Sequence, residues 1–282
     1  RVESTGPQIL AARLARAQAL AAAQGIDALL ITPGPDLRYL VGYDAVPLER
    51  LTCLVIPAHG DPVLVAPRLE LLAAEASPVG RLGLALEGWG ETEDPYAIVA
   101  RIAGRATRVG LDNHMWAEKA LGLRAAMPGC EQVLAGAVLA EQRMRKDAAE
   151  VDALAAAGAA IDTVHAQVAG LLRPGRTERD VASDIADLIL QAGHTRVDFI
   201  IVGSGPNGAS PHHEVSDRIL EHGDAVVVDI GGTMPDGYRS DCTRTYAIGA
   251  VPAGFAERYA VLQEAQAAAT AYVRAGVSCE AV

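Results

Sequence analysis

The amino-acid sequence predicts an α/β protein made of two domains, and three observations support this fold class. The chain has 282 residues, more than one domain usually needs, so two domains of about 100–200 residues each are expected. Half of the residues are apolar but only 4% are aromatic, so the core is built mainly from Ala, Val, Leu and Ile. Strand-like and helix-like segments alternate through residues 1–139, as in compact α/β domains.

The first domain is expected over residues 1–139. Its helices are predicted from apolar residues at helical spacing, and its strands from short apolar runs bounded by turn residues. The predicted helices cover residues 9–24, 68–76 and 116–126, and the predicted strands cover 26–32, 107–112 and a pair joined at 59–62.

The second domain is expected over residues 140–282 and has a different character. One long helix over residues 139–172 leads to a break at Pro174 and Gly175, after which Thr177 and Asp180 resemble a capping box for a second helix. A strand, a polar loop, an apolar hairpin and a final helix follow. Two helices followed by antiparallel strands indicate an α+β arrangement.

Composition excludes several classes of partner. Acidic residues outnumber basic ones 35 to 24 and no dense Lys/Arg block occurs, so neither nucleic acid nor an anionic membrane surface is an expected partner. The four cysteines form no C-x-x-C pair and no signal peptide is recognisable, which favours a cytoplasmic protein. The chain begins without methionine and ends where Ser278 resembles a helix N-cap, so we expect part of a longer polypeptide.

The apolar hairpin over residues 223–249 carries two acids, Asp229 and Asp241, in strand-like surroundings. If the turn is a three-residue loop centred on Pro235, the two residues pair across the strands with their Cβ atoms roughly 4.5–5.5 Å apart. Three arrangements relieve such repulsion: one carboxyl stays protonated, Arg239 or Arg244 pairs with the acids, or a divalent metal ion binds both.

The seven histidines separate into two groups. His212 and His213 lie in a Pro-containing loop between strands, where functional side chains are often displayed, although a surface pair is the plain alternative. The others are expected to be structural or exposed because they have no partners at ligand spacing: His59, His114, His165, His194 and His222.

Several separated motifs resemble one family, the "pita-bread" metallohydrolases that include prolidases, aminopeptidase P, methionine aminopeptidase and creatinase. The segment "VVVDIGGTMPDGYRSDCTRTYAIG" is similar to the family's D-x-G…Y-x-S-D-x-T-R-T segment, and "GSGPNGASPHHEVSDRIL" resembles its upstream N…P-H…S-D loop. The segment "GIDALLITPGPDLRYLVGYD" resembles the creatinase/prolidase N-terminal domain, which methionine aminopeptidases lack. The implied architecture is a creatinase-like α/β domain followed by an incomplete α+β pita-bread domain.

The resemblance implies roles for individual residues. Asp229 and Asp241 match the first two metal ligands, and His212 matches the catalytic loop histidine that contacts the substrate, with His213 as a weaker candidate for substrate contact. Thr243 matches a position whose hydroxyl orients a ligand carboxylate. The implied cofactors are two divalent metal ions, with Mn²⁺ as the first choice and Co²⁺ or Zn²⁺ as alternatives.

The function implied by the resemblance is metal-dependent hydrolysis of the Xaa-Pro bond in short peptides by a homodimeric peptidase. The family's remaining ligands, one histidine and two glutamates, come later in the chain than Val282, so these residues alone are expected to be inactive. Two alternatives stay open: a non-catalytic peptide-binding or assembly module, and a creatinase-like enzyme acting on a guanidino or amide compound. The aspartate pair favours the metallopeptidase, because creatinases work without metal.

Overall fold

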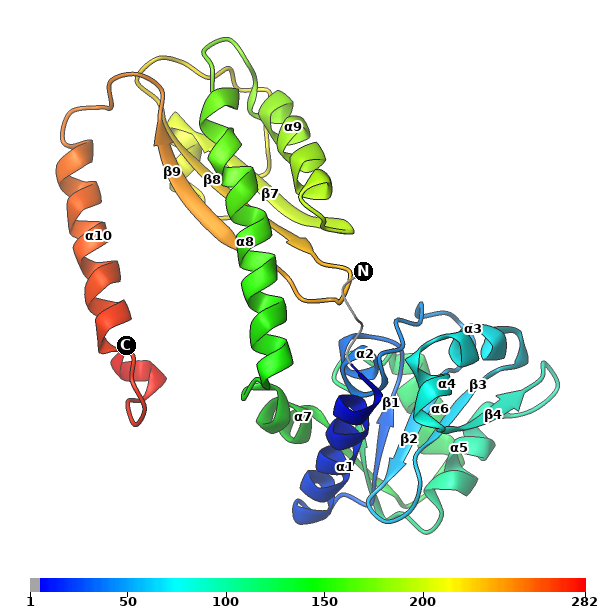
Figure 1. Ribbon diagram of the computed structural model, residues 1–282. Helices are drawn as coiled ribbons and strands as arrows, with labels where there is room; N and C mark the ends of the chain where they lie inside the picture. The colour runs from blue at the N-terminus through cyan, green and yellow to red at the C-terminus, as the bar shows by residue number, and fades with distance from the viewer. Residues whose placement is uncertain (1–5) are drawn as a thin grey trace. The chain divides into compact units, whose positions relative to one another are not determined.

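The computed structural model describes residues 6–282, which form two compact units, one running to Ala149 and the other covering Glu150–Val282 (Figure 1). The predicted long helix is in fact two helices, α7 (Gly136–Arg143) and α8 (Ala148–Leu171). The prediction was wrong because these helices pack on different cores. Leu139 of α7 is buried in the core of the first unit, whereas Ile161 of α8 is buried in the core of the second.

The first unit is built on a six-stranded mixed sheet with the strand order β4-β3-β2-β1-β5-β6. The strands β1 and β2 are antiparallel, as are β2 and β3, while the other neighbouring pairs are parallel. The strands are β1 (Ala28–Ile31), β2 (Cys53–Pro57), β3 (Val63–Pro67), β4 (Ala85–Trp89), β5 (Arg108–Leu111) and β6 (Glu131–Leu134).

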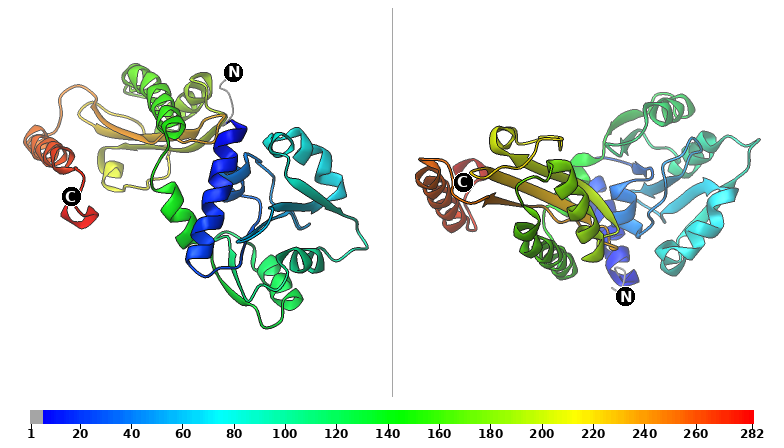
Figure 2. Two further views of the ribbon diagram at one scale, coloured as in Figure 1. Left: turned by 60° about the horizontal axis from the view of Figure 1, so that its bottom comes forward. Right: turned by 90° about the horizontal axis from the view of Figure 1, so that it is seen from above.

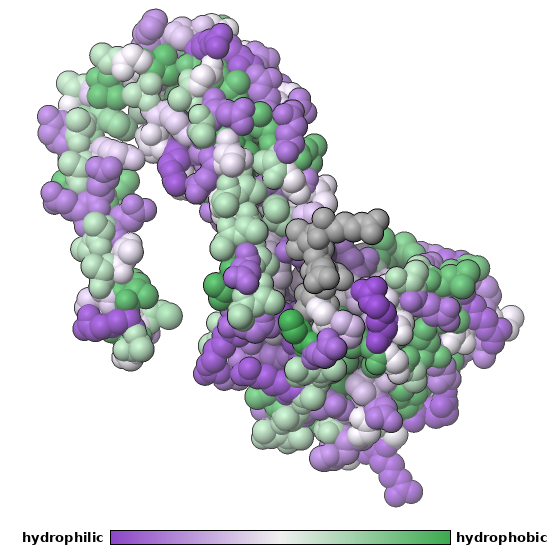
Figure 3. All heavy atoms as spheres, viewed as in Figure 1, coloured by the Kyte–Doolittle hydropathy of each residue, from purple (hydrophilic) through white to green (hydrophobic). Residues whose placement is uncertain are grey.

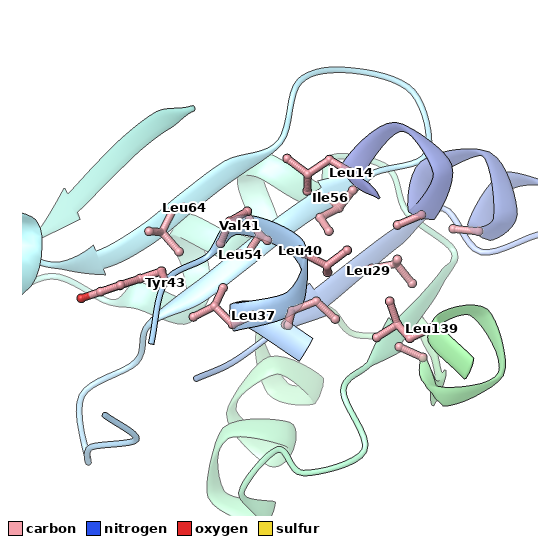
Figure 4. Packing of buried hydrophobic residues seen from close by; sticks show 14 of the residues in the cluster. Leu14, Leu29, Leu37, Leu40, Val41, Tyr43, Leu54, Ile56, Leu64 and Leu139 are labelled. Atoms are coloured by element: carbon pink, nitrogen blue, oxygen red, sulfur yellow. The ribbon is translucent and has the colours of Figure 1, made fainter. Parts of the chain in front are cut away.

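Helices cover both faces of this sheet, and each face has its own core. All four residues of β1 are buried: Leu29 and Ile31 belong to one core and Ala28 and Leu30 to the other. A strand covered on both faces reads as a continuous apolar run, which explains why this segment was recognisable in the sequence. Figure 4 shows leucines from α1, α2 and α7 meeting the strands β1–β3 in the first of these cores.

The helical elements of the first unit are as follows. They are α1 (Pro7–Ala23), α2 (Pro35–Val41), η1 (Arg68–Glu70), α3 (Leu71–Ala76), α4 (Pro78–Leu82), α5 (Pro95–Ala103), α6 (Ala117–Ala126) and α7.

The second unit is a three-stranded antiparallel sheet of order β7-β8-β9, made of β7 (Arg196–Ser204), β8 (Ala225–Thr233) and β9 (Cys242–Ala247). The helices α8 and α9 (Glu178–Gln191) lie on one face of it (Figure 2). Alternate residues of β8 point to this face, and they are fully buried with the helices: Val226, Val228 and Ile230.

The opposite side of this sheet is called the open face here. It consists of the alternate residues that point away from α8 and α9; on β8, Val227 and Asp229 are only partly covered, whereas Gly231 is buried. Its members are Phe199, Ile201, Gly203, Val227, Asp229, Gly231, Asp241, Thr243 and Thr245.

The remaining elements of the second unit are η2 (Gly205–Ala209), α10 (Phe255–Tyr272) and η3 (Cys279–Ala281). No residue of α10 is buried, and hydrophobic and hydrophilic residues mix along its visible face (Figure 3). No helix within residues 6–282 combines the length and the apolar character that crossing a membrane requires.

A buried carboxylate ties α9 to β7 and to the loop that carries the two adjacent histidines. The predicted capping box is confirmed: Thr177 Oγ1 accepts from the Asp180 amide, and Asp180 accepts from the Thr177 amide. The first residue of the helix, Glu178, has a side chain that is 0% exposed. Its oxygens accept hydrogen bonds of 2.6–3.1 Å from the amides and hydroxyls of Ser204 and Ser216.

Two further side chains complete the environment of Glu178. Asn207 Nδ2 donates to Oε1 at 3.0 Å, and His213 Nε2 lies 2.7 Å from Oε2. Burial by itself raises the pKa of Glu178, but the hydrogen bonds from Ser204, Ser216 and His213 outweigh it and lower this pKa to about 2. The carboxylate therefore stays charged in the folded protein although no solvent reaches it.

We predict that Glu178→Gln loosens the histidine loop and destabilises the second unit by on the order of 3 kcal/mol at pH 7. Because the pKa of Glu178 is lowered from 4.5 to about 2 on folding, its stabilisation is complete above pH 4.5. It is lost as the pH falls from 4.5 towards 2, so the difference between the two proteins should shrink over this range.

Hydrogen exchange of the Ser204 and Ser216 amides and urea unfolding at several pH values measure this effect. The matched control is Glu214→Gln, which removes an exposed carboxylate from the same loop. Equal exchange rates in Glu178→Gln and Glu214→Gln at pH 7 would show that the buried carboxylate does not hold the loop.

Candidate functional site

The register of the hairpin differs from the predicted one. Asp229 pairs with Thr243, not with Asp241, and the bridge between Thr233 and Arg239 continues the same register towards the turn. The prediction assumed a three-residue loop centred on Pro235, but this register is centred one residue later. The partner of Asp229 therefore shifts by two residues along β9.

A shift of two residues keeps both acids on the open face, because side chains on a strand alternate with a period of two. Asp229 and Asp241 are then diagonal neighbours, whose Cα atoms are typically about 7–8 Å apart, instead of direct partners. Thr243 lies directly opposite Asp229, two residues after Asp241, and donates from Oγ1 to Asp229 Oδ1 at 2.6 Å. The Thr243 hydroxyl thus contacts one of the two carboxylates predicted as metal ligands, and its role in orienting a ligand stays a prediction.

Neither arginine proposed to relieve the two acids does so. Arg239 lies 3.7 Å from Asp198, and Arg244 lies 3.5 Å from Asp162 of α8. Arg244 pairs with Val228, whose side chain is buried against the helices, so it belongs to the opposite face from Asp229. Within residues 6–282, Asp241 makes no side-chain hydrogen bond or ion pair.

The donor set at Asp229 and Asp241 fits a hard divalent cation. Carboxylate oxygens are the ligands that Mg²⁺ and Mn²⁺ prefer, and one oxygen of Asp229 and both of Asp241 are available. Residues 6–282 contain no group of three or more His, Cys, Asp or Glu side chains placed to hold a metal ion. The described part of the chain thus supplies two carboxylates towards such a site.

The histidine loop reaches the same face of the sheet. A Cβ atom built on Gly203 would lie 3.1 Å from the Gly208 Cα, so η2 packs against the open face beside β7. Gly203 pairs with Val227, which is two residues from Asp229. The loop that continues from η2 to His212 therefore starts next to the carboxylate strand.

The two adjacent histidines have different environments. The ring of His213 is held by Glu178, and only 15% of its side chain is exposed. His212 is exposed and has no side-chain partner within residues 6–282. Substrate contact by either residue stays a prediction, and the free ring of His212 suits it better.

Sequence reasoning missed Glu178 as an organising residue of the site. The sequence predicts a turn and a helix start at "PGRTE" and a cap at Thr177, but it does not show where the side chain of the next residue points. The sequence signal for this role is a glutamate at the start of a helix, followed later by two polar segments that contain Ser204 and Ser216. It becomes specific only when the fold brings these segments together.

Two family models match the chain. Residues 13–145 match the creatinase/prolidase N-terminal domain, and residues 152–282 match metallopeptidase family M24. The two matches meet near the boundary between the compact units after Ala149.

Relatives of known sequence agree with these matches. The chain is 51% identical to the probable dipeptidase PepE of Mycobacterium tuberculosis, over 98% of this chain and 73% of the relative. It is 30% identical to the Xaa-Pro dipeptidase of Lactobacillus helveticus, over 86% of this chain and 67% of the relative.

Experimental structures show the same fold. The dipeptidase PepE from Mycobacterium ulcerans superposes with a TM-score of 0.89 at 51% identity, covering 94% of this chain and 72% of that one. The prolidase from Thermococcus sibiricus superposes with a TM-score of 0.84 at 30% identity, with the same coverage.

These comparisons confirm the architecture that the resemblance implied, a creatinase-type N-terminal domain followed by a pita-bread domain. They give no support to the expectation that these 282 residues are inactive, since 98% of the chain matches a relative named as a dipeptidase. The family follows from the two family matches and from the similarity to dipeptidases, and the two carboxylates on one face of the hairpin agree with it. The chain belongs to metallopeptidase family M24, a peptidase family for which divalent metal ions are implied.

Proposed function

We propose that this protein hydrolyses the peptide bond of Xaa-Pro dipeptides with the help of two divalent metal ions. The observation that carries the proposal is that Asp229 of β8 and Asp241, directly before β9, lie on one face of the hairpin, with Thr243 bound to Asp229. The names of the relatives, a probable dipeptidase and an Xaa-Pro dipeptidase, support the reaction and the substrate class.

Three residues of the hairpin have defined roles in the proposed reaction. Asp229 and Asp241 hold the metal ions through carboxylate oxygens. Thr243 occupies Asp229 Oδ1, which fixes the carboxylate and leaves Oδ2 for a ligand bond. When bound, divalent ions of this kind lower the pKa of a water molecule and polarise the carbonyl of the scissile bond.

The loop histidine supplies the substrate contact. His212 has a free ring on a loop whose neighbour, His213, is fixed by Glu178. A ring N–H of His212 donates a hydrogen bond to the peptide carbonyl oxygen, where negative charge develops during attack. A fixed neighbour limits the positions of this ring, which lowers the entropy lost when substrate binds.

The finer features of the proposal are Mn²⁺ as the metal, with Co²⁺ or Zn²⁺ as alternatives, a homodimer as the assembly and the cytoplasm as the location. Assays of Xaa-Pro dipeptide cleavage after loading with each metal, together with light scattering, test the first two. A protein that binds Xaa-Pro peptides but never cleaves them would favour the alternative of a peptide-binding module.

We predict that Asp229→Asn and Asp241→Asn each lower metal-dependent dipeptide hydrolysis by more than about 100-fold, because loss of a metal ligand should exceed the 10–100-fold typical of outer-shell changes. Asparagine keeps the shape but loses the charge that attracts the cation. In metal-free protein neither substitution should lower the thermal midpoint, because each removes one of two nearby like charges.

The matched control is Asp152→Asn on the exposed side of α8, which should keep full activity. Full activity in Asp241→Asn would exclude this carboxylate as a ligand. A large loss of stability in the metal-free variants would mean that the acids have structural partners instead.

We predict that Thr243→Val weakens Mn²⁺ binding about tenfold, because it removes the hydroxyl bound to Asp229 while keeping the β-branched shape. Thr243→Ser should restore most of the affinity. Isothermal titration with Mn²⁺ measures both variants. Thr245→Val is the control, because it removes a hydroxyl from the same face of β9 that makes no side-chain hydrogen bond within residues 6–282. Equal Kd values for both valine variants would contradict the prediction.

A further inference from the structure

Two buried histidines take no part in the proposed reaction. His165 of α8 is 7% exposed, and His194, which follows α9, is 4% exposed. A buried imidazole must satisfy both ring nitrogens, so its partners show what it holds in place. Both rings bind residues that are adjacent to Asp241 in the sequence.

His194 holds the residue before Asp241. Its Nε2 lies 2.8 Å from Ser240 Oγ, and its Nδ1 lies 3.1 Å from the carbonyl oxygen of Ile189. A carbonyl can only accept, so Nδ1 carries a proton, and Nε2 is the ring atom that contacts the Ser240 hydroxyl. The amide of Ser240 also donates to the Gly232 carbonyl at 2.9 Å, and the Gly232 amide donates to Ser240 Oγ at 3.1 Å.

His165 holds the residue after Asp241. Its Nε2 donates to the Cys242 carbonyl oxygen at 2.9 Å, and its Nδ1 lies 2.9 Å from the Tyr246 hydroxyl. Burial lowers the pKa of His165 and favours the neutral ring, and the Tyr246 hydroxyl also donates to the carbonyl oxygen of His165 at 3.1 Å. The imidazole thus joins α8 to two residues of the edge strand β9.

The sequence of β8 makes room for one of these rings. A Cβ atom on Gly232 would lie 2.8 Å from His194 Cδ2, closer than any side chain permits. The second glycine of "DIGG" is therefore the residue that lets the imidazole reach Ser240. The strand β8, the segment just before β9 and the end of α9 meet at this contact.

Because side chains alternate along a strand, these two contacts also limit the position of Asp241. Ser240 and Cys242 direct their side chains towards the helices, so the side chain between them points to the open face. With the residue on either side hydrogen-bonded to a buried ring, the backbone at Asp241 has little freedom to shift or rotate.

We propose that His165 and His194 are positioning residues for Asp241 and fix the direction in which its carboxylate meets a metal ion. The proposal rests on the proposed function, because it concerns the same carboxylate. Loss of either ring leaves the Asp241 carboxylate present but allows it a wider range of positions. Metal affinity therefore falls even where the fold is kept.

The test uses four histidine variants of the whole chain: His194→Leu, His194→Gln, His165→Leu and His165→Gln. Glutamine can offer a polar group near the position of Nε2, whereas leucine cannot. Mn²⁺ affinity is read from the paramagnetic broadening of the Asp241 and Thr243 amide signals during titration, which also detects weak binding. Thermal midpoints of the metal-free proteins are recorded alongside.

The expected result is that each leucine variant weakens Mn²⁺ binding about tenfold or more, and that each glutamine variant recovers most of the loss. His222→Leu, a change at an exposed histidine, should bind Mn²⁺ like the unmodified protein. A purely structural role would lower the thermal midpoint without changing the affinity of the molecules that remain folded.

Ser240→Ala keeps the test decisive if a leucine variant does not fold, because it removes only the hydroxyl that His194 binds. Wild-type Mn²⁺ affinity in Ser240→Ala, or in a folded leucine variant, would overturn the positioning role and leave the proposed function standing. Absence of Mn²⁺ broadening at Asp241 in the unmodified protein would overturn both.

Discussion

The buried carboxylate of Glu178 is the interaction on which the functional side of the second unit depends. Hydrogen bonds from Ser204, Asn207, His213 and Ser216 converge on its two oxygens, and they come from β7, from η2 and from the histidine loop. A buried charge costs free energy unless its lone pairs are filled, so these segments are stabilised only when all of them are in place together. Glu178 also lies at the N-terminus of α9, where the free backbone amides further stabilise its negative charge.

Much of the fold could be predicted from the sequence, because the signals were local. The buried strand β1 is a continuous apolar run, the cap at Thr177 lies within four residues, and the hairpin of β8 and β9 is bounded by turn residues. The strands β4 and β6 were not predicted. Each is only partly buried, with a pattern that includes exposed positions and that gives neither a clean alternation nor an apolar run.

The parts of the site that the sequence could not give depend on contacts between distant segments. The hairpin register required the true geometry of the turn, which a Pro and a Gly in five residues do not determine. The sequence predicts His165 and His194 to be structural or exposed, but it does not identify Cys242 and Ser240 as their partners, because these lie far from them along the chain. The carboxylate pair itself was recognisable because both acids interrupt one apolar hairpin.

The alternation of side chains across β8 and β9 also limits how this hairpin can diverge. The turn between Thr233 and Arg239 can gain or lose residues, because a change in its length leaves the pairing of β8 with β9 unchanged. Inside the strands, a change of one residue would exchange the two faces, send Asp241 towards the helices and leave a charge in the apolar core. The fold therefore tolerates insertions and deletions at the tip of this hairpin, whereas within the strands only changes of two residues keep Asp241 on the open face.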